Sequence, residues 1–579
     1  MPARFHALAF DYDGTLTHRD TLPSEVREGL ARARAAGFKL VLVTGRILAE
    51  LREVLPDVDD LFDAIVAENG AVLANADGVR LLAPPVDPDL AGALAARDVP
   101  LRSGRVLLAC DARHAPTVLE EIGRLGLDEQ LIRNRGALMV LPSGVSKGTG
   151  LLDALGDLRV SARSTVAVGD AENDLPLLEA AELGVAVADG VDSLKQRADL
   201  VLERPNGEGV LELLDGPVLS GRERIVPQRR RLTLGATREG NPVTLPAAES
   251  RLLITGPSGS GKSYLTGLLV EQLVALRYGV LVLDREGDHV GLASRRGVVL
   301  AGGASGPPPP SEVVTLLCHR FGSVVLDLSL LDDAQRVGYE RELLPLVCDL
   351  EERCGSPHWI VLDEAHVTLE DSPAAPAIAG GGGRVFATYR PNELSETVRA
   401  DLDAAVLLPG DGPGAEDLGE VIASLCGDLP EAGAEVTRLA HGQGLLLPLA
   451  GQGEPVVFDH GDRCSPHVRH WHKYTEAQLP EDLRFRFGAD GERGVAGNIR
   501  EFHRVLRTLD ERALREHAAR SDFSRWVREA LQERDLATSV AIVESDLRVR
   551  GDDAERVRAE LLATIERHYL VGLPQLVSR

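Results

Sequence analysis

The first 215 residues alternate short apolar runs with segments of helical periodicity. Each apolar run is long enough for one buried strand, and turn-forming residues such as Gly, Asp and Asn follow most of them. The predicted strands are 7–10, 38–43, 64–67, 165–168, 184–188 and 198–201. Helical patterns over 24–36 and 147–155 lie between them. This alternation predicts an α/β fold, with a doubly wound parallel sheet covered by helices on both faces.

Residues 81 to about 145 interrupt the alternation. The stretch opens with three prolines, Pro84, Pro85 and Pro88, and then mixes strand and helix signals. We interpret it as an α+β cap inserted into a first domain that covers residues 1–215.

A second alternating region covers residues 216–465. It begins with a linker and a predicted β-hairpin around 239–241. Five apolar runs then predict a second parallel α/β domain, at 251–255, 280–283, 324–328, 358–362 and 384–388. After Pro466 the pattern becomes helical, which predicts a small helical domain over 466–579. Its predicted helices are 498–509, 513–520, 523–533 and 552–568.

Composition narrows the classes of partner and compartment. The 579-residue chain has a formal net charge of −26, which disfavours a general polyanion-binding surface but not a local basic groove, so nucleic acid is a possible partner that the charge does not favour. Its six cysteines show no C-x-x-C spacing, as expected for reduced thiols in a cytoplasmic protein. No apolar run reaches about 18 residues, and no basic-then-apolar segment opens the chain, so we expect no membrane span and no signal peptide.

Polar side chains suited to phosphate chemistry gather where strands of the first domain end or a helix begins. They are Asp11, Asp13, Thr44, Lys147, Asp170 and Asp174. Because ligands of parallel α/β sheets bind at the carboxyl ends of the strands, we expect these groups to share one site. Carboxylates suit a divalent cation or a nucleophile, and a hydroxyl and an ammonium suit phosphoryl oxygens. The residues therefore predict a site for phosphate and Mg²⁺.

Five stretches of this region occur in an order that is typical of one superfamily. They are DYDGT, VLVTGR, AENGA, VSKGTGL and GDAEND. Together they resemble the haloacid dehalogenase (HAD) phosphohydrolases, in the Cof-type branch with a late-inserted cap. The resemblance implies that Asp11 is the nucleophile that forms an aspartyl-phosphate. It implies that Asp13 acts as general acid and then as general base, and that Thr44 and Lys147 hold the transferring phosphoryl group.

The same resemblance implies a Mg²⁺ site. Its ligands would be the Asp11 carboxylate, the backbone carbonyl of Asp13 and the Asp170 carboxylate, with Asp174 and Asn173 in support. A cation there would bring the phosphate dianion close to a carboxylate nucleophile.

The strand at 251–255 runs into a complete G-x-x-x-x-G-K-[ST] sequence, and a helical pattern follows. The eight residues are Gly256, Pro257, Ser258, Gly259, Ser260, Gly261, Lys262 and Ser263. In such a P-loop the backbone amides cradle phosphates, the lysine reaches the β- and γ-phosphates, and the serine ligates Mg²⁺. Only five lysines occur in the chain, and two of them, Lys147 and Lys262, stand at predicted phosphate-binding positions. We predict an ATP site in a RecA-like P-loop domain.

The strand at 358–362 ends in Asp363 and Glu364, a Walker B pattern. Asp363 would hold Mg²⁺ through water, and Glu364 would be catalytic by polarising the attacking water. With the hairpin, the DREGD stretch and the ATYRP ending, this region resembles the HerA/FtsK-type P-loop ATPases. That family usually has Gln where Tyr389 stands, so the resemblance does not imply efficient hydrolysis here.

The HerA/FtsK resemblance also implies a ring-shaped homo-oligomer and DNA translocation, which the acidic net charge disfavours. Arg390 and Arg399 are the candidates for an arginine finger. The basic run 229–231 is interpreted as a solvated turn. The cluster of His467, His470 and His472 is interpreted as packing or surface rather than as a metal site.

Four functions follow from these features. The first is a Mg²⁺-dependent phosphatase that acts on a small phosphate ester, with an ATP-hydrolysing half that regulates or powers it. The second is a nucleic-acid end-processing enzyme of the polynucleotide kinase/phosphatase kind, and the third is a DNA translocase with an accessory phosphatase. The fourth makes the P-loop half a nucleotide-gated binding module, in which Tyr389 keeps turnover low. The cap sets substrate choice, and sugar phosphates and phosphoglycolate are among the classes left open.

Overall fold

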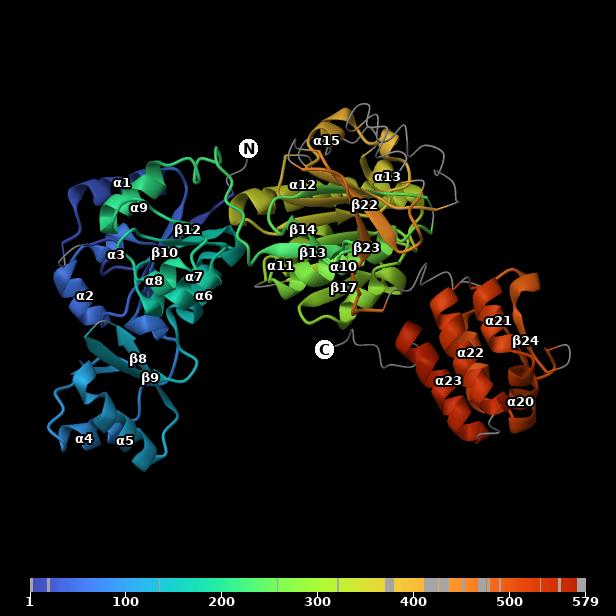
Figure 1. The fold of residues 1–579 in the computed structure, drawn as a ribbon, viewed down its shortest axis with the longest axis horizontal. Helices are drawn as coiled ribbons and strands as arrows, with labels where there is room; N and C mark the ends of the chain where they lie inside the picture. The colour runs from blue at the N-terminus through green and yellow to red at the C-terminus, as the bar shows by residue number, and fades with distance from the viewer. Residues whose placement is uncertain are drawn as a thin grey trace. The chain divides into compact units, whose positions relative to one another are not determined.

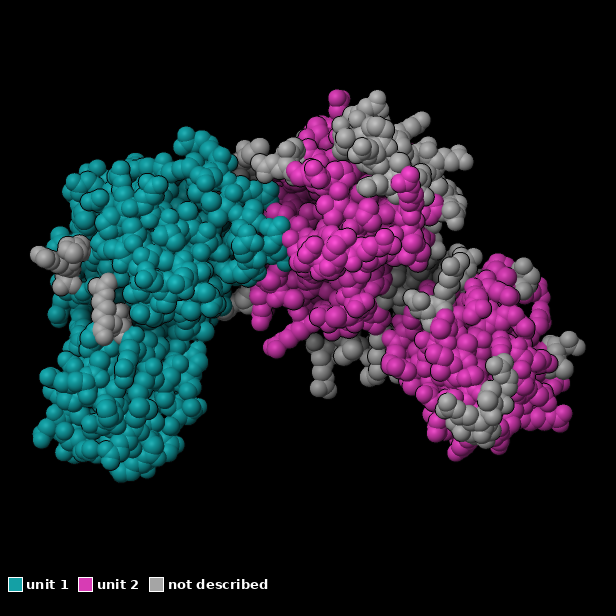
Figure 2. Space-filling view, in the orientation of Figure 1, with its two compact units in different colours: residues 1–231, 349–358 teal, residues 232–348, 359–579 magenta. Residues whose placement is uncertain are grey.

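The computed structural model describes most of the chain as two compact units (Figure 2). The first unit consists of residues 1–231 and 349–358, and the second of residues 232–348 and 359–579. The described residues are 4–17, 21–134, 136–257, 259–319, 322–369, 378, 380–410, 425, 436, 438–449, 453–466, 475, 479–488, 491–531, 533–549 and 553–569.

The first unit is built on an eight-stranded sheet in the order β12-β11-β10-β1-β2-β3-β4-β5. The strands are β1 (Ala7–Phe10), β2 (Lys39–Val43), β3 (Ala64–Ala67), β4 (Val72–Asn75), β5 (Gly78–Leu81), β10 (Thr165–Gly169), β11 (Leu183–Ala186) and β12 (Leu200–Val201). Strands β12 to β3 are parallel, and β4 and β5 add an antiparallel edge. The predicted parallel sheet is confirmed.

Helices cover both faces of this sheet. They are α1 (Ser24–Ala35), α2 (Leu48–Val54), α3 (Val58–Leu61), α6 (Lys147–Leu158), α7 (Leu175–Ala180), α8 (Asp192–Lys195) and α9 (Asn206–Asp215). The side chains of β1 alternate between two apolar layers: Leu8 and Phe10 lie in one, and Ala7 and Ala9 in the other. Burial on both faces explains why β1 is apolar throughout.

The cap is a separate four-stranded sheet in the order β6-β7-β9-β8, with α4 and α5 on one face (Figure 1). Its elements are α4 (Pro88–Ala95), β6 (Arg102–Ser103), β7 (Leu108–Asp111), α5 (Ala115–Leu125), β8 (Glu129–Asn134) and β9 (Ala137–Pro142). Alternation along β9 sends Leu138 and Val140 towards the helices of the cap. It sends Met139 and Leu141 into the apolar layer of the main sheet. The cap therefore packs on the domain through an apolar face.

The second unit contains an eleven-stranded sheet in the order β14-β13-β23-β22-β21-β15-β20-β19-β16-β18-β17. The strands are β13 (Arg231–Ala236), β14 (Pro242–Pro246), β15 (Arg251–Thr255), β16 (Val280–Asp284), β17 (Val298–Gly302), β18 (Ser323–Asp327), β19 (Trp359–Leu362), β20 (Gly383–Thr388), β21 (Ala404–Leu407), β22 (Gln443–Pro448) and β23 (Val456–His460). The predicted hairpin is β13 and β14, which lie side by side at one edge. The described helices of this region are α10 (Lys262–Ala275), α11 (Pro310–Leu317), α12 (Asp333–Cys354), α13 (Ala365–Leu369) and α15 (Glu396–Ala400).

The C-terminal region is helical, as predicted. It contains the strands β24 (Phe485–Phe487) and β25 (Gly494–Ala496) and the helices α19 (Ile499–Thr508), α20 (Glu511–Ala519), α21 (Asp522–Glu529), α22 (Arg534–Val549) and α23 (Ala554–Tyr569). The rings of Phe502 and Trp526 stack at 4.7 Å in its core. Helix α22 was not predicted; β-branched residues weaken its helical signal, and burial of Val540 and Val543 in the core compensates. The predicted histidine cluster at 467–472 lies outside the described residues. Among the described helices, none combines the length and apolar character that a membrane span needs.

The basic run 229–231 is not a solvated turn, and that interpretation is wrong. Arg229 forms an ion pair with Asp199 at 2.6 Å and donates to the carbonyl of Ala181 at 3.2 Å. Arg230 donates to the carbonyl of Glu179 at 3.0 Å. These carbonyls lie at the carboxyl end of α7, where a helix leaves acceptors unsatisfied and attracts cations. The run 229–231 therefore binds the carboxyl end of α7 and holds the linker against it.

The first unit also contains a segment from much later in the chain, residues 349–358. The carbonyl of Cys354 accepts the N–H of Ser161 at 3.2 Å, and Nε2 of His358 lies 2.6 Å from Oγ of Ser161. The Ser164 hydroxyl donates to the carbonyl of Gly355 at 3.1 Å. We call residues 349–358 the returning segment.

Candidate functional sites

The first site lies at the carboxyl ends of three neighbouring strands. Asp11 follows β1, Thr44 follows β2, and Asp170 follows β10. In the register of the sheet, Phe10 pairs with Leu42 on one side and with Val168 on the other. The loops that carry the predicted groups therefore start at the same edge of the sheet.

A buried lysine links two of the predicted carboxylates. Lys147 begins α6 after the N-cap Ser146, and its Nζ lies 2.5 Å from Oδ1 of Asp11 and 2.5 Å from Oδ1 of Asp174. Asp174 is held in place because its Oδ2 accepts the N–H groups of Asp170 and Ala171, each at 2.9 Å. The three charged groups are nearly inaccessible to solvent.

Burial and neighbouring charges shift the pKa values of this group. Burial, with a further contribution from the Asp174 charge, raises the pKa of Asp11 well above its ordinary value, and the Lys147 ammonium opposes this. Burial alone would lower the pKa of Lys147, but Asp11 and Asp174 overcome it and raise that pKa. The lysine therefore stays charged in the site.

The carboxylates form a group that fits a divalent cation. Asp11, Asp170 and Asp174 are buried, and each offers an oxygen within 4.8 Å of the others. The Thr15 hydroxyl donates to Oδ1 of Asp170 at 3.3 Å, which orients that carboxylate. Hard oxygen donors of this kind suit Mg²⁺.

Asp13 has a partner that the sequence did not indicate. Nε and Nη2 of Arg46 donate to its two carboxylate oxygens at 2.7 Å and 2.5 Å. The backbone N–H of Arg46 donates to the Thr44 hydroxyl oxygen at 3.1 Å. Arg46 follows Thr44 in the T-G-R sequence, and this position was the only available signal for its role. It connects a predicted proton shuttle to a predicted phosphate-binding loop.

The cap covers the edge of this site. A Cβ atom on Gly45 would lie 3.3 Å from Sδ of Met139, which belongs to cap strand β9.

Asn173, in the loop after Asp170, donates through Nδ2 to Oδ1 of Asn69 at 3.2 Å. Both asparagine side chains are buried. The predicted supporting residue Asn173 therefore contacts the loop that follows β3.

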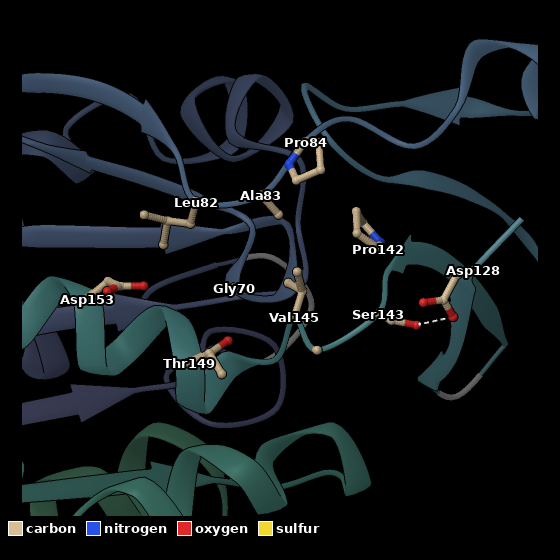
Figure 3. Close-up of a pocket in the computed structure, with 11 residues that line it drawn as sticks. Gly70, Leu82, Ala83, Pro84, Asp128, Pro142, Ser143, Val145, Thr149 and Asp153 are labelled. Carbon is tan, nitrogen blue, oxygen red and sulfur yellow. Dashed lines mark hydrogen bonds between the residues drawn. The ribbon is translucent and has the colours of Figure 1, made fainter. Parts of the chain in front are cut away.

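A cleft of about 460 Å³ opens where the cap joins the main domain (Figure 3). Pro84 on the entering linker and Pro142 at the end of β9 face each other across it, and Ser143 donates to Asp128 at 2.9 Å. Thr149 and Asp153 of α6 complete its lower wall. The cleft lies between the two connections on which the cap could turn.

The second site is the P-loop between β15 and α10. Gly259 and Gly261 have φ values of 84° and 102°, which only glycine adopts readily. The Lys262 ammonium donates to the carbonyls of Gly256 and Pro257 at 3.0 Å and 3.1 Å. The predicted residue Ser258 lies outside the described residues. Ser260 and Lys262 are buried, and Ser263 is the second residue of α10.

The Walker B acids stand two strands away from the P-loop strand. Asp363 and Glu364 follow β19, and β20 lies between β19 and β15. Asp363 is buried, and burial together with the charges of Asp288 and Asp284 raises its pKa well above the ordinary value. Burial raises the pKa of Glu364 to about 7, although the Lys262 ammonium opposes the shift. The raised pKa values show that the surroundings disfavour the charged forms of both acids. A bound cation would stabilise those charged forms.

Two further residues join this site that the sequence analysis did not assign. Asp284 and His289 each offer a ligand atom within 4.8 Å of those of Asp363. Asp284 accepts the backbone N–H groups of 287, 288 and 289. Burial and the nearby Asp327 and Asp288 charges raise the pKa of Asp284 to about 8. The DREGD stretch is therefore part of the acidic wall of the site.

Tyr389 stands directly after β20, between the two halves of this site. Nζ of Lys262 lies 5.9 Å from the centre of its ring, and the ring of His366 meets it edge-on at 5.1 Å. Nδ1 of His366 lies 2.9 Å from Oγ1 of Thr388. Arg390 forms an ion pair with Glu393 at 3.0 Å, and Arg399 lies on α15.

Comparison with known proteins gives two family matches. The family described as "haloacid dehalogenase-like hydrolase" matches residues 8–94 and 120–214. A phosphoglycolate phosphatase of Methanothermobacter thermautotrophicus is 33% identical over 214 residues, covering 36% of this chain and 96% of that protein. The chain belongs to the haloacid dehalogenase-like hydrolases. This HAD-like region is followed by a HerA-like one, because "Helicase HerA, central domain" matches residues 234–334.

Other relatives match the same HAD-like region. Phosphoglycolate phosphatase 2 of Saccharolobus solfataricus is 32% identical over 222 residues, covering 37% of this chain and 92% of that protein. A crystal structure of a haloacid dehalogenase-like hydrolase from Bacteroides thetaiotaomicron is 22% identical, with a TM-score of 0.32. It covers 36% of this chain and 98% of that chain.

Proposed function

We propose that the chain is a Mg²⁺-dependent phosphomonoesterase that acts through an aspartyl-phosphate, and that its HerA-like region binds and hydrolyses ATP to regulate or power this activity. The observation that carries the proposal is the buried contact of Lys147 with Asp11 and Asp174, beside Asp170 at the same sheet edge. A charged lysine, together with a Mg²⁺ ion that the clustered carboxylates would hold, would bind a phosphoryl dianion next to a carboxylate nucleophile.

The proposed reaction has two steps. An Asp11 oxygen attacks phosphorus, the ester P–O bond breaks, and the Asp13 carboxyl gives its proton to the departing alkoxide. Asp13 then takes a proton from water, which attacks the aspartyl-phosphate and releases inorganic phosphate. Thr44 and Lys147 hold the phosphoryl oxygens, and Arg46 orients Asp13. A bound Mg²⁺, held by Asp11, Asp170 and the Asp13 carbonyl with Asp174 in support, would neutralise charge between the phosphate and the nucleophile.

We propose a small phosphorylated acid of the size of phosphoglycolate as the substrate. Two considerations support it. The two relatives of M. thermautotrophicus and S. solfataricus, which align over more than nine-tenths of their own length, are named phosphoglycolate phosphatases. The face that the cap turns to the site is apolar and closely packed, with Met139 against the loop at Gly45, which favours a short leaving group.

A panel of phosphate esters tests this proposal. We expect phosphoglycolate to be hydrolysed with a higher kcat/KM than hexose phosphates, and EDTA to abolish the activity until Mg²⁺ is restored. Phosphate release should be followed with and without ATP and with a 5′-phosphorylated oligonucleotide in the same panel. A higher kcat/KM on the oligonucleotide would replace the proposal with the nucleic-acid end-processing function.

The returning segment supports regulation by the HerA-like region. It leads directly into β19, whose end carries Asp363 and Glu364. Its contacts are with residues that precede the strands of the phosphatase site: His6 Nε2 lies 2.9 Å from the carbonyl of Glu352 just before β1, and Ser161 and Ser164 stand before β10. A shift of β19 with bound nucleotide would therefore reach the strands that carry Asp11 and Asp170.

Replacing His358 with Ala should uncouple the two activities. Loss of the contact between His358 and Ser161 is expected to leave phosphatase activity without ATP within about twofold and to remove most of the change that ATP causes, because residues far from the chemistry modulate coupling between sites. Phosphate release from the ester at increasing ATP measures this. Arg353→Ala is the matched control, since Arg353 is on the same segment but exposed. An unchanged ATP response in His358→Ala would contradict the role of the segment.

A further inference from the structure

Glu68 binds the cap through three consecutive backbone amides. It follows β3 in the short turn η1 (Glu68–Gly70), and its side chain is fully buried. Its carboxylate accepts the N–H groups of Arg105 at 2.9 Å, Val106 at 2.8 Å and Leu107 at 3.1 Å. A Cβ on Gly104 would lie 2.3 Å from Oε2 of Glu68, so only glycine fits beside the carboxylate.

This arrangement is specific for an ionised carboxylate. Two oxygens with about four acceptor positions satisfy three donors, and hydrogen bonds to a charged acceptor are the stronger kind. An amide in its place would offer one oxygen and would turn an NH₂ group towards backbone N–H donors. The loop between β6 and β7 therefore forms an anion nest that the main domain fills with its own side chain.

The turn that carries Glu68 also contacts the loops of the phosphatase site. The N–H of Glu68 donates to the carbonyl of Arg46 at 2.9 Å, and the N–H of Asn69 donates to the carbonyl of Thr44 at 3.0 Å. Asn69 in turn accepts the side-chain N–H of Asn173. Glu68 and Asn69 have φ values of 53° and 54°, in the left-handed region that asparagine tolerates but that is unfavourable for glutamate. The surrounding contacts hold this strained turn in place.

A second polar contact between the cap and the main domain is weaker than this one. Arg102 on β6 donates to Glu50 on α2 at 3.0 Å, but the Arg102 side chain is exposed and that of Glu50 is partly exposed, and such pairs contribute little. The cap connects to the main domain through the linker that carries Pro84 and through the residues that follow Pro142, with the open cleft between them (Figure 3). Val86, on the entering linker, donates to the carbonyl of Val106 and ties the linker to the nest.

We propose that Glu68 is a positioning residue that holds the cap closed over Asp11 and Asp13 during the reaction. Glu68 holds the cap through the N–H groups of 105–107. The backbone of η1 holds the loop that carries Thr44 and Arg46, so the position of the cap and the position of this loop are linked. Closure excludes water and fixes the short substrate under Met139. This inference rests on the proposed phosphatase function.

Glu68→Gln tests whether Glu68 holds the cap in place. Glu50→Gln is the matched control, because Glu50 contacts Arg102 of the cap through a partly exposed ion pair. We expect kcat/KM on phosphoglycolate to fall roughly 10- to 100-fold in Glu68→Gln, because misplaced reacting groups lose about this much rate. On p-nitrophenyl phosphate, whose leaving group needs no proton from Asp13, we expect a loss below about threefold. Glu50→Gln should change neither rate, and Glu68→Asp, which keeps the charge, should recover part of the loss.

Amide hydrogen exchange separates this inference from the function on which it rests. Exchange at residues 105–107 should be at least about tenfold faster in Glu68→Gln, with the strands of the main sheet unchanged, because only the cap contact opens. This readout needs no substrate. Unchanged exchange at 105–107 would show that Glu68 does not hold the cap, whatever ester is hydrolysed. Equal losses on both esters together with faster exchange throughout the unit would also overturn this inference, since Glu68 would then serve stability alone.

Discussion

Replacing Asp11 with Asn is expected to reduce phosphate release from the ester by roughly a thousandfold or more, because an amide is not a nucleophile towards phosphorus. Asn has nearly the same shape, so the buried packing around β1 is kept, and Lys147 retains Asp174 as a partner. A phosphate-release assay with Mg²⁺ measures the loss. Mass spectrometry of the protein mixed with excess ester should detect a phosphoryl adduct on the unaltered chain and none on the variant.

Asp192→Asn is the matched control for this experiment. Asp192 lies in the same unit but is exposed, and its only expected role is the pair with Lys195 one helical turn away. The control should keep its phosphatase activity, and Asp11→Asn should keep its ATP hydrolysis. Full phosphatase activity in Asp11→Asn would show that the nucleophile lies elsewhere.

Replacing Glu364 with Gln is expected to slow ATP hydrolysis by about 100- to 10,000-fold, the range that a positioned general base contributes. ATP binding should remain, because the P-loop amides and Lys262 are unaltered. Steady-state turnover and equilibrium binding of a fluorescent ATP analogue measure the two properties separately. Glu396→Gln is the control, since Glu396 lies in the first turn of α15 and is exposed.

The same pair of assays distinguishes an ATPase from a nucleotide-gated binding module. If the unaltered chain binds ATP but turns it over as slowly as Glu364→Gln, the binding module is the better description. Tyr389→Gln should then raise turnover, because it restores the residue that HerA/FtsK-type ATPases carry after this strand. An unaltered rate in Tyr389→Gln would remove Tyr389 as the cause.

Much of the first site could be predicted because the carboxyl ends of parallel strands lie at the same edge of a sheet. Asp11, Thr44 and Asp170 follow apolar runs, and a parallel sheet brings such positions to one edge whatever the intervening sequence. Lys147 was predicted from the Ser-Lys-Gly sequence at a helix start, and Ser146 is indeed the N-cap. The prediction of the site therefore rested on local patterns and one topological rule. The roles assigned to these residues stay predictions until they are tested.

The remaining features depend on contacts that leave no pattern. The nest around Glu68 is made of backbone N–H groups at 105–107, and every residue except proline has one. The returning segment contacts the first unit largely through the carbonyls of Glu352, Cys354 and Gly355, which carry no sequence signal. Side-chain chemistry can be read from sequence, whereas backbone recognition requires the fold.

The returning segment decides where the chain can be divided. A fragment that ends at residue 231 would lack ten residues of its own unit, and the hydroxyl of Ser164 and the N–H of Ser161 would lose acceptors inside it. Gly355 fits so closely that a Cβ there would lie 2.0 Å from Oγ of Ser164, so no side chain could substitute for it. The two halves are thus interleaved rather than joined end to end. A division of the chain that keeps these contacts must therefore retain the returning segment with the N-terminal half.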